Sequence, residues 1–241
     1  MSIPLAIVGC GKMGRLVEQL APEYEFEVCA RFSQSNIGSL SRESLKGATV
    51  AIEFTAPASA PENLQRLATL KVNTVCGTTG WYEQLPQVRE SVAAAQTALV
   101  YAANFSIGVS LFFNIVARAA ALFAQHSEYE AWGWEIHHSA KKDAPSGTLK
   151  KLAEEMRQAG FTGPLNLGSN RAGAHTGTHE IGFDSSADTV TLRHTARSRE
   201  GYARGALQAA RWIAGKKGVF EFREILGELR SPEATAAPRS G

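Results

Sequence analysis

"PLAIVGCGKMGRLVEQLAPE", residues 4–23, is the stretch that decides the fold of the first half of this chain. An apolar run from Leu5 to Val8 leads directly into a glycine turn, and the apolar residues after the turn recur at helical spacing. The stretch therefore predicts a buried strand, a tight turn and an amphipathic helix. Gly9, Gly11 and Gly14 stand in G-x-G-x-x-G register, which in this strand–helix context is typical of dinucleotide binding.

Each glycine of this turn has a separate physical role. Gly9 permits the tight turn, Gly11 lets the backbone approach a pyrophosphate, and Gly14 lets helix and strand pack closely. The unpaired N–H groups at the helix start then attract the phosphate charge. The alternative is a tight turn between strand and helix that binds no ligand.

Further along the first half, apolar stretches repeat the alternation of strand and helix. Strands are predicted within residues 26–33, 48–57, 72–81 and 97–106, with a helix near residues 61–70. Strands that alternate with helices through short loops form a parallel sheet covered on both faces. We therefore predict an α/β fold in which residues 1–104 form a Rossmann-like, doubly wound parallel sheet.

The pattern changes after Asn104. Residues 107–126 predict a long apolar helix, residues 129–139 alternate like an antiparallel strand, and residues 146–160 predict a helix with Ser146 as its N-cap. Residues 176–198 are typical of two alternating strands joined by a turn. A smaller α+β domain is thus predicted over residues 105–203. For residues 204–241 we predict a helix that returns to the first domain, a short strand or turn, and a flexible tail.

The ends of the strands bear on the cofactor. An acidic residue after the second strand would bind the ribose hydroxyl of NAD, whereas Arg31 in "CARFSQS" suits the 2′-phosphate of NADP. We therefore expect NADPH, or use of both NADPH and NADH; alternatively, Arg31 is a solvated residue. Three loops of small residues follow other strands, at the edge where such sheets bind ligands: residues 53–57, 77–80 and 102–106.

"EIHHSAKKDAPSGT", residues 135–148, places cations beside a helix start. Backbone N–H groups at a helix start are unpaired, so the start at Ser146, Gly147 and Thr148 can hold a carboxylate. A lysine close to other cations tends to have a lowered pKa, which helps it release a proton. The expected ligand is a small dianion. The residues before the helix supply the positive charge: His137, His138, Lys141 and Lys142.

The two histidines admit other interpretations. His137 and His138 are neighbours on a predicted strand, so they point to opposite faces unless the strand ends there. Metal binding is discounted, because no third His, Cys or acidic ligand stands at standard spacing. A dinucleotide site combined with proton donors around a small carboxylate is typical of a reductase.

Composition and charge argue against several classes of protein. The net charge of +2 on 241 residues gives no reason to expect nucleic acid as a partner. No apolar run approaches the roughly 20 residues that span a bilayer, and the N-terminus lacks the features of a signal peptide. The three widely spaced cysteines suggest no disulfide framework. We expect a cytoplasmic protein that does not bind membranes.

Several motifs resemble one known family. "EIHHSAKKDAPSGT" is similar to the signature of the 4-hydroxy-tetrahydrodipicolinate reductases, also called dihydrodipicolinate reductases. "GCGKMG", "EFTAP", "GTTGW", "AANFSIGV" and "GSNRAGAHTGTHEIGF" resemble other motifs of that family, in the same order. The resemblance covers nearly the whole chain except the tail. It implies reduction of 4-hydroxy-tetrahydrodipicolinate to tetrahydrodipicolinate by NADPH or NADH, with loss of water, in diaminopimelate and lysine biosynthesis. It also implies a homotetramer that assembles through the substrate domain.

The resemblance further implies roles for individual residues. His137 matches a proton donor and acceptor, Lys141 a proton donor, and His138 a substrate contact. Gly147 and Thr148 match the backbone pair that holds a substrate carboxylate. Arg31 stands where many members carry an acid, and the glycine turn is one residue shorter than in many members. The residues that match cofactor contacts are Gly9, Cys10, Gly11, Lys12, Met13, Gly77, Thr78, Thr79, Ala102, Ala103, Asn104 and Phe105.

Two other functions stay open at this stage. A different Rossmann oxidoreductase, such as an amino-acid or homoserine-type dehydrogenase, would share the glycine turn but would have no reason to carry HHxxKxDAPSGT. A non-catalytic NADP-binding sensor would need the nucleotide loops alone.

Overall fold

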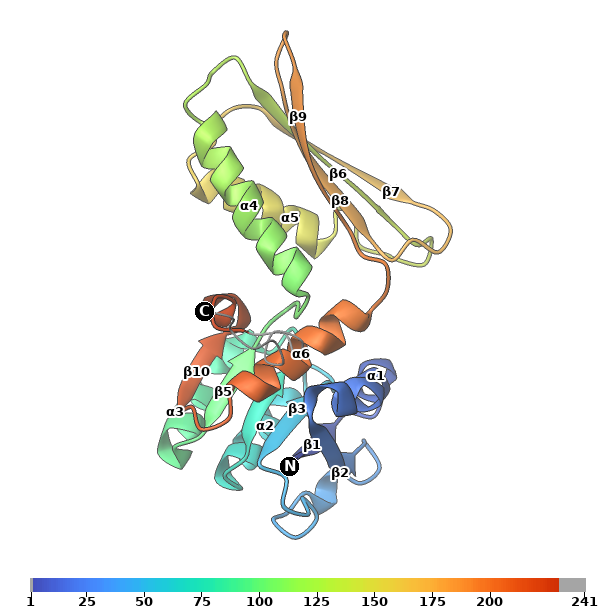
Figure 1. The fold of residues 1–241 in the computed structure, drawn as a ribbon, viewed down its shortest axis with the longest axis vertical. Coiled ribbons are helices and arrows are strands. Elements are labelled where there is room, and N and C mark those ends of the chain that lie inside the picture. The colour runs from blue at the N-terminus through green and yellow to red at the C-terminus, as the bar shows by residue number, and fades with distance from the viewer. Residues whose placement is uncertain (1, 230–241) are drawn as a thin grey trace, which may run out of the picture. The chain divides into compact units, whose positions relative to one another are not determined.

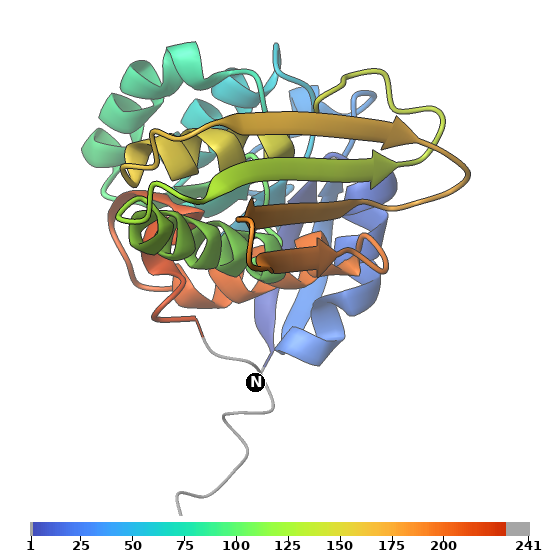
Figure 2. The same cartoon turned by 90° about the horizontal axis from the view of Figure 1, so that it is seen from above.

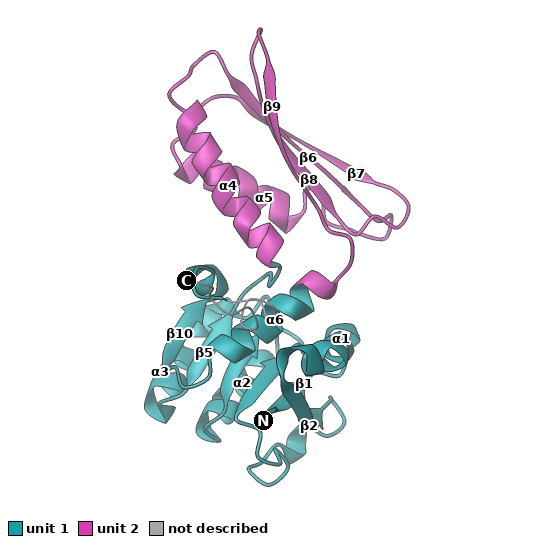
Figure 3. Cartoon of the chain, in the orientation of Figure 1, with its two compact units in different colours: residues 1–106, 202–241 teal, residues 107–201 magenta. Residues whose placement is uncertain are grey.

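The computed structural model describes residues 2–229, which divide into two compact units (Figure 1). One unit joins the residues up to Ser106 with those from Tyr202 onward, and the other runs from Ile107 to Gly201 (Figure 3). The second unit is therefore an insertion in the chain of the first. From residue 230 onward the predicted tail lies outside the described residues.

A parallel sheet of six strands forms the centre of the first unit. The strands lie in the order β10-β5-β4-β3-β1-β2, and every neighbouring pair is parallel. This arrangement confirms the predicted Rossmann-like fold. The elements of this sheet and its helices are β1 (Ile3–Val8), α1 (Lys12–Leu20), β2 (Phe26–Phe32), β3 (Val50–Glu53), α2 (Ala60–Thr69), β4 (Asn73–Cys76), α3 (Leu85–Ala95), β5 (Ala98–Tyr101), α6 (Glu200–Trp212) and β10 (Gly218–Glu221).

Helices cover both faces of this sheet, which explains why its central strands are mostly apolar and buried. All four residues of β3 are buried, as are most residues of β1 and β4. The α2 and α3 helices pack together over one face around Leu64, Val88 and Val92, and α6 lies on the opposite face (Figure 2). Ion pairs from Arg204 to Glu23 and from Arg211 to Glu25 join α6 to the turn after α1.

The strand order sets the place of the first site. The β1 strand lies between β2 and β3, so the chain leaves β1 in one direction for β2 and returns on the other side for β3. At such a switch point the loops after the two central strands diverge and leave a crevice at their carboxyl ends. The glycine turn after β1 and the loop after β3 lie at this edge.

The second unit is a mixed sheet covered on one face by two helices. The strands lie in the order β7-β6-β8-β9; the β6–β7 pair is parallel, and the β6–β8 and β8–β9 pairs are antiparallel. The core between helices and sheet includes Phe112, Val116, Leu152, Ile181 and Phe183. The elements are α4 (Ile107–Phe123), β6 (Glu130–His137), α5 (Gly147–Gln158), β7 (Leu165–Arg171), β8 (Thr178–Asp184) and β9 (Thr189–Thr195).

One strand of this sheet was not predicted from the sequence. The β7 strand, LNLGSNR, contains only two large apolar residues, and its second half, Gly168 to Asn170, is typical of a turn. It forms because it is an edge strand that pairs along the whole length of β6, from Ala131 with Leu165 to His137 with Arg171. Tertiary pairing thus overrides a weak local preference.

Two further predictions can be compared with the described residues. Cys10, Cys29 and Cys76 are all unpaired thiols. Within residues 2–229, every helix is too short or too polar to cross a bilayer.

Candidate active site

The glycine turn after β1 has the geometry that its sequence predicts. Gly9 has a φ of +102°, and a Cβ atom there would lie 2.0 Å from the carbonyl oxygen of Phe54. A Cβ at Gly14 would lie 2.0 Å from the carbonyl oxygen of Gly9, whereas a Cβ at Gly11 would meet nothing within 4 Å. Gly9 and Gly14 are therefore required by packing, and the space beside Gly11 is open.

The α1 helix begins at this turn without a side-chain cap. Gly11 is its N-cap residue, no side chain bonds the first amides, and the first turn contains no acidic residue. The helix start thus presents unpaired N–H groups and the positive end of the helix dipole. Lys12 adds a cation at the same place. This is an arrangement that suits a phosphate.

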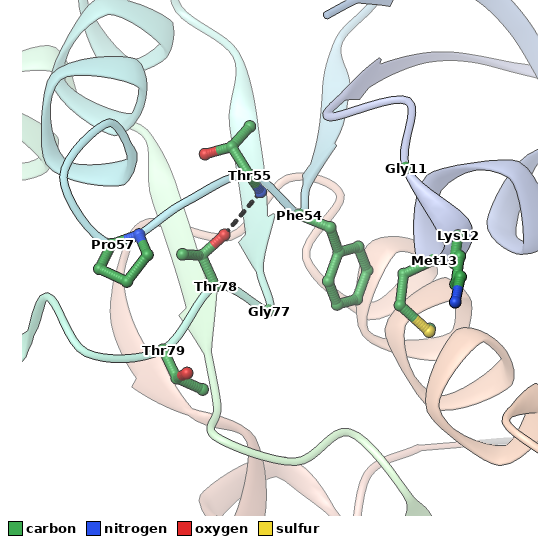
Figure 4. A pocket seen from close by; sticks show the side chains of 9 residues that line it. All are labelled: Gly11, Lys12, Met13, Phe54, Thr55, Pro57, Gly77, Thr78 and Thr79. Carbon is green, nitrogen blue, oxygen red and sulfur yellow. Dashed lines mark hydrogen bonds between the residues drawn. The ribbon is translucent and has the colours of Figure 1, made fainter. Parts of the chain in front are cut away.

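A cavity of about 430 Å³ opens beside this helix start (Figure 4). Its wall combines the glycine turn with the loops after β3 and β4, as expected for the crevice of a doubly wound sheet. Six of the predicted cofactor residues line it, together with three residues of the loop after β3. The lining residues are Gly11, Lys12, Met13, Phe54, Thr55, Pro57, Gly77, Thr78 and Thr79.

Thr78 fixes the two loops on the far side of this cavity. Its hydroxyl accepts a hydrogen bond of 2.7 Å from the backbone N–H of Thr55 (Figure 4). Its carbonyl oxygen accepts one of 2.8 Å from the indole N–H of the buried Trp81. A Cβ at Gly77 would collide with the Phe54 ring, at 2.0 Å from its nearest atom. The loops after β3 and β4 are therefore held close together, because the Thr78 hydroxyl bonds the backbone of Thr55 and because Gly77 has no side chain to push the Phe54 ring away.

Several predicted cofactor residues do not line this cavity. Gly9 packs against the backbone of Phe54. The Cys10 thiol donates to the carbonyl oxygen of Phe32 at 3.4 Å. The segment after β5 forms its own turn, in which the Asn104 side-chain oxygen accepts the N–H of Ser106 at 2.8 Å. The other members of that segment are Ala102 and Phe105, which are buried, and Ala103, which is exposed.

Arg31 also lies outside the lining of this cavity. Its guanidinium Nε donates to the Glu18 carboxylate of α1 at 2.7 Å, and both side chains are largely exposed. The hydrogen bond to Glu18 raises the pKa of Arg31 further. Arg31 therefore already has an anionic partner, and a 2′-phosphate would compete with that partner for the guanidinium.

The second site is built on one face of β6. Side chains of a strand alternate between faces, so Ala131, Gly133, Glu135 and His137 share the face that packs against α5. A Cβ at Gly133 would indeed meet Leu149 of α5, at 3.1 Å. The strand ends at His137, so His138 follows outside the sheet and is not bound to the opposite face. The sequence left open that the two histidines need not point to opposite faces if the strand ends there, and the strand does end there.

Glu135 is a fully buried carboxylate, with 0% of its surface exposed. Its Oε1 accepts hydrogen bonds from the Ser146 N–H at 2.8 Å, from Arg171 at 2.9 Å and from the Ser169 hydroxyl at 3.0 Å. Its Oε2 accepts the Ser146 hydroxyl. Burial alone would raise the pKa of Glu135, but these hydrogen bonds outweigh it and lower the pKa to about 2. The carboxylate is therefore ionised at any working pH.

His137 and His179 face this carboxylate from neighbouring strands. The distance from Glu135 Oε2 is 3.6 Å to His137 Nδ1 and 3.4 Å to His179 Nε2. Burial lowers the pKa of both histidines, to about 4 for His179. For His137 the cations Lys141 and Arg171 add to this effect, while Glu135 opposes it. Both rings are therefore mainly neutral at pH 7 in this structure.

The loop between β6 and α5 carries the predicted proton donor Lys141. Its ammonium group donates to the Asp143 carboxylate at 2.7 Å and is partly buried, and this bond lowers the pKa of Asp143. The next residue, Lys142, is exposed. Of the two neighbouring lysines, Lys141 is thus the more buried one and is paired with a carboxylate of the same loop. The backbone carbonyl of Asp143 also accepts a hydrogen bond from Arg171, which fixes the loop against β7.

The start of α5 is capped as predicted, and it leaves two amides unused. The Ser146 hydroxyl accepts the N–H of Leu149 at 3.2 Å, and Ser146 uses its own N–H on Glu135. Within the described residues, neither the N–H of Gly147 nor that of Thr148 has a hydrogen-bond acceptor. A Cβ at Gly147 would meet nothing within 4 Å. The pair of amides is therefore free and accessible to a carboxylate.

Sequence reasoning found the histidine, the lysine and the helix start, but it missed the network behind them. Glu135, His137 and His179 place ligand-type atoms within 4.8 Å of one another, although the sequence shows no metal-ligand spacing. Strand pairing brings them together, with Glu135 opposite both Ser169 and His179. The signal that could have revealed Glu135 is its place in the alternation of β6, where a charged residue falls on the buried face. The residues missed are Glu135, Ser169, Arg171 and His179.

Comparison with known families agrees with the two-unit architecture. Residues 3–105 match the model for the N-terminus of dihydrodipicolinate reductase, and residues 108–226 match the model for its C-terminus. The chain belongs to the dihydrodipicolinate reductase family. The boundary between the two matches falls where the chain passes from the first unit to the second.

Individual members of the dihydrodipicolinate reductase family match over most or almost all of their length. A 4-hydroxy-tetrahydrodipicolinate reductase of Methanosarcina mazei is 31% identical over 93% of this chain and 99% of its own. The reductase of the same name from Christiangramia forsetii is 29% identical, over 93% of this chain and 98% of its own. One from Neisseria meningitidis is 34% identical, over 74% of this chain and 72% of its own.

Solved structures share the fold. A dipicolinate-bound dihydrodipicolinate reductase from a Paenisporosarcina species superposes with a TM-score of 0.77 at 24% identity, over 93% of this chain and 100% of the other. An amine dehydrogenase from Mycobacterium smegmatis gives a TM-score of 0.64 at 11% identity, over 92% of this chain and 96% of the other. At these identities the likeness describes the architecture of the backbone.

Proposed function

We propose that this chain reduces 4-hydroxy-tetrahydrodipicolinate to tetrahydrodipicolinate with NADPH or NADH, with loss of water, in diaminopimelate and lysine biosynthesis. The observation that carries the proposal is the second site. Two free amides at a helix start, those of Gly147 and Thr148, follow His137 and Lys141 within one short loop, and the buried Glu135 carboxylate fixes this helix start. Such a site suits a small dicarboxylate that must receive a proton. Family membership supports the same reaction.

The residues of the second site divide the work of binding and proton transfer. The amides of Gly147 and Thr148 hold one substrate carboxylate at the positive end of α5, and His138 contacts the substrate from just beyond the end of β6. When bound, the dinucleotide supplies a hydride to the ring carbon conjugated with the imine. Lys141 or His137 then provides the proton that neutralises the developing negative charge.

A dinucleotide suits the first site on the evidence of the residues themselves. The open space at Gly11, the uncapped start of α1 and Lys12 fit a pyrophosphate. The loop containing Gly77, Thr78 and Thr79 offers backbone and hydroxyl groups on the opposite wall. The remaining predicted contacts, Cys10 and Ala102 to Phe105, flank this region on the carboxyl ends of β1 and β5. We propose NADPH as the preferred cofactor, because a cation, Arg31, stands at the end of β2, where it suits a 2′-phosphate.

The expected assembly is a homotetramer, formed through the outer face of the second sheet. Trp132 and Trp134 alternate with Gly133, so they lie on the face opposite α4 and α5, and both are only half-buried. A Cβ at Gly182 would collide with the Trp132 indole at 2.2 Å, so the indole packs against Gly182 of β8. We place the enzyme in the cytoplasm, in keeping with its unpaired thiols.

A coupled assay tests this function. The unstable substrate is generated in situ from pyruvate and aspartate semialdehyde, and oxidation of NADPH and of NADH is followed in parallel. Turnover with either cofactor is expected for the wild-type enzyme, with a shift toward NADH in Arg31→Asp. Tight cofactor binding without turnover would instead identify a sensor or another dehydrogenase.

A further inference from the structure

The Glu135 carboxylate connects the two parts of the substrate site. Through Oε1 it accepts the N–H of Ser146, and through Oε2 it accepts the hydroxyl of the same residue, so it holds the N-cap of α5 at both polar groups. The same Oε2 atom lies 3.6 Å from His137 Nδ1. One buried anion thus lies between the carboxylate-binding helix start and a proposed proton donor.

Among the charges around His137, Glu135 is the anion that raises the pKa of its ring most. His179 faces His137 with ring centroids 5.1 Å apart, but its pKa of about 4 leaves it neutral. Asp143 is engaged by Lys141 at 2.7 Å. The titratable and charged groups that act on His137 come from its own strand, from the loop after it, and from β7 and β8: Glu135, Lys141, Asp143, Arg171 and His179. His194 of β9 lies opposite His179 and acts on that ring.

The orientation of the His137 ring assigns different tasks to its two nitrogens. Nδ1 is buried, has no hydrogen-bond partner and faces the carboxylate. Nε2 faces Gly177, where a Cβ would lie 3.0 Å away, so only a glycine leaves this nitrogen clear. A proton on Nδ1 directed at an anion fixes the tautomer and leaves Nε2 to exchange protons with a ligand.

We propose, on the basis of the reductase function above, that Glu135 is a positioning residue. It orients His137 through Nδ1 and fixes the start of α5 through Ser146, so that proton delivery and dicarboxylate binding depend on the same buried carboxylate. Glu135 itself touches neither substrate nor cofactor.

A metal ion would be another use of Glu135, His137 and His179, and the surroundings argue against it. The two carboxylate oxygens already accept four hydrogen bonds, from Ser146 twice, from Ser169 and from Arg171. One of these donors is a guanidinium, which would repel a cation bound to the same carboxylate. The Glu135 carboxylate is therefore the centre of a hydrogen-bonding network with Ser146, Ser169 and Arg171, and the two histidines lie beside it. Stoichiometric zinc in the purified enzyme would overturn this interpretation.

The test compares Glu135→Gln with Glu130→Gln in the coupled assay over a range of pH. Glu130 lies on the same strand but is exposed, so it is a matched control for loss of one carboxylate. In Glu135→Gln we expect kcat to fall about 10- to 100-fold, as for other groups that orient a functional histidine, and KM for the substrate to rise. The dissociation constant for NADPH should not change, because the nucleotide cavity is lined by the other unit.

The pH profile separates positioning from a merely structural role. Glu135 raises the pKa of His137, so its removal lowers that pKa, and the alkaline limb of kcat, which reports loss of the protonated acid, should move to lower pH. Glu130→Gln should retain the wild-type profile. A fall in kcat with an unmoved alkaline limb would reduce Glu135 to a structural role, and wild-type kinetics in Glu135→Gln would overturn the proposal outright.

Two further measurements keep the result interpretable. Glu135→Asp retains the charge at a shorter reach and should give an intermediate shift, so it carries the test if the Gln variant fails to fold. Calorimetry with dipicolinate, a stable dicarboxylate, needs no turnover. The wild type should take up a proton on binding, because a dianion raises the pKa of His137, and the pH of maximal uptake should be lower in the variants. Proton uptake without turnover would refute the reductase function and support the role of Glu135. Turnover with the same uptake profile in the wild type and the variants would support the reductase function and refute the role of Glu135.

Discussion

Two helices of this molecule begin at proposed anion sites, and they are built in opposite ways. The α1 helix begins after Gly11, which offers no side chain, and the space beside it is open. The α5 helix begins after Ser146, which is tied at its N–H and hydroxyl to the buried Glu135. Under the proposed function, the first start would let the backbone approach a large ligand that other loops also contact. The second would hold a small ligand in a fixed position, as proton transfer to one atom requires.

The difference predicts where each site is vulnerable. The nucleotide site depends on space, so added atoms should damage it, whereas the substrate site depends on charged partners, so removed atoms should damage it. Four experiments test this contrast, beginning with the one that should have the largest effect.

Lys141→Ala should lower kcat by roughly 100- to 10,000-fold, the usual range for loss of a proton donor. NADPH affinity should stay unchanged, because Lys141 belongs to the second unit. Lys142→Ala is the control, since Lys142 is adjacent but exposed. Steady-state kinetics and cofactor fluorescence titration measure the two quantities. Equal losses of turnover and of NADPH affinity in Lys141→Ala would contradict the role of this lysine.

Gly9→Ala should lower the free energy of unfolding by about 3 kcal/mol, because a Cβ would meet a backbone oxygen at a positive φ. Gly11→Ala adds the same methyl group in open space, so the free energy of unfolding should change by less than about 1 kcal/mol. Its cofactor affinity should nevertheless fall, since the methyl group occupies the approach to the pyrophosphate. Denaturant unfolding and NADPH titration compare the pair. If Gly11→Ala bound NADPH normally, the pyrophosphate would have to lie elsewhere.

His179 should make the second unit sensitive to acid. Its pKa of about 4 lies below the ordinary 6.5, so between these pH values His179 is protonated in the unfolded chain and neutral in the folded chain. Its contribution to stability is therefore complete above pH 6.5 and is lost as the pH falls toward 4, by about 3 kcal/mol. Unfolding by urea at pH 7 and pH 4 should show a smaller difference in His179→Gln than in the wild type. An identical difference in both proteins would mean that His179 titrates normally.

Glu18→Gln should have the smallest effect. It removes the anion that pairs with Arg31 and so frees the guanidinium for a 2′-phosphate. We expect NADPH to bind about two- to fivefold more tightly, in the range of an exposed ion pair, and NADH to bind as before. Titration with both cofactors tests this. A parallel change for NADPH and NADH would place Arg31 away from the 2′-phosphate.

The contrast between the two sites also explains what the sequence could reveal. The nucleotide unit is encoded locally: strand, glycine turn and helix follow one another within residues 3–20, so periodicity alone predicts them. The six residues of the cavity wall that were predicted belong to two short motifs. Phe54, Thr55 and Pro57 were placed in a loop near the sheet edge, but their part in the wall depends on strand order.

The network around Glu135 in the second unit depends on residues that are far apart in the sequence. Glu135 meets Ser169 and Arg171 more than 30 residues further along the chain, and His179 more than 40, through strand pairings that no local pattern shows. The decisive strand, β7, has a glycine and polar residues where a strand signal would be expected. The chemistry-bearing residues of the opening motif could thus be recognised, while the groups that orient them could not.

The insertion of one unit into the other has a consequence for synthesis on the ribosome. The β10 strand completes the edge of the nucleotide sheet by pairing with β5, yet 116 residues separate Tyr101 from Gly218. The whole substrate unit emerges in that interval. The chain of the second unit is therefore complete before that of the first. Until β10 has been synthesised, the nascent first sheet exposes the hydrogen-bonding edge of β5.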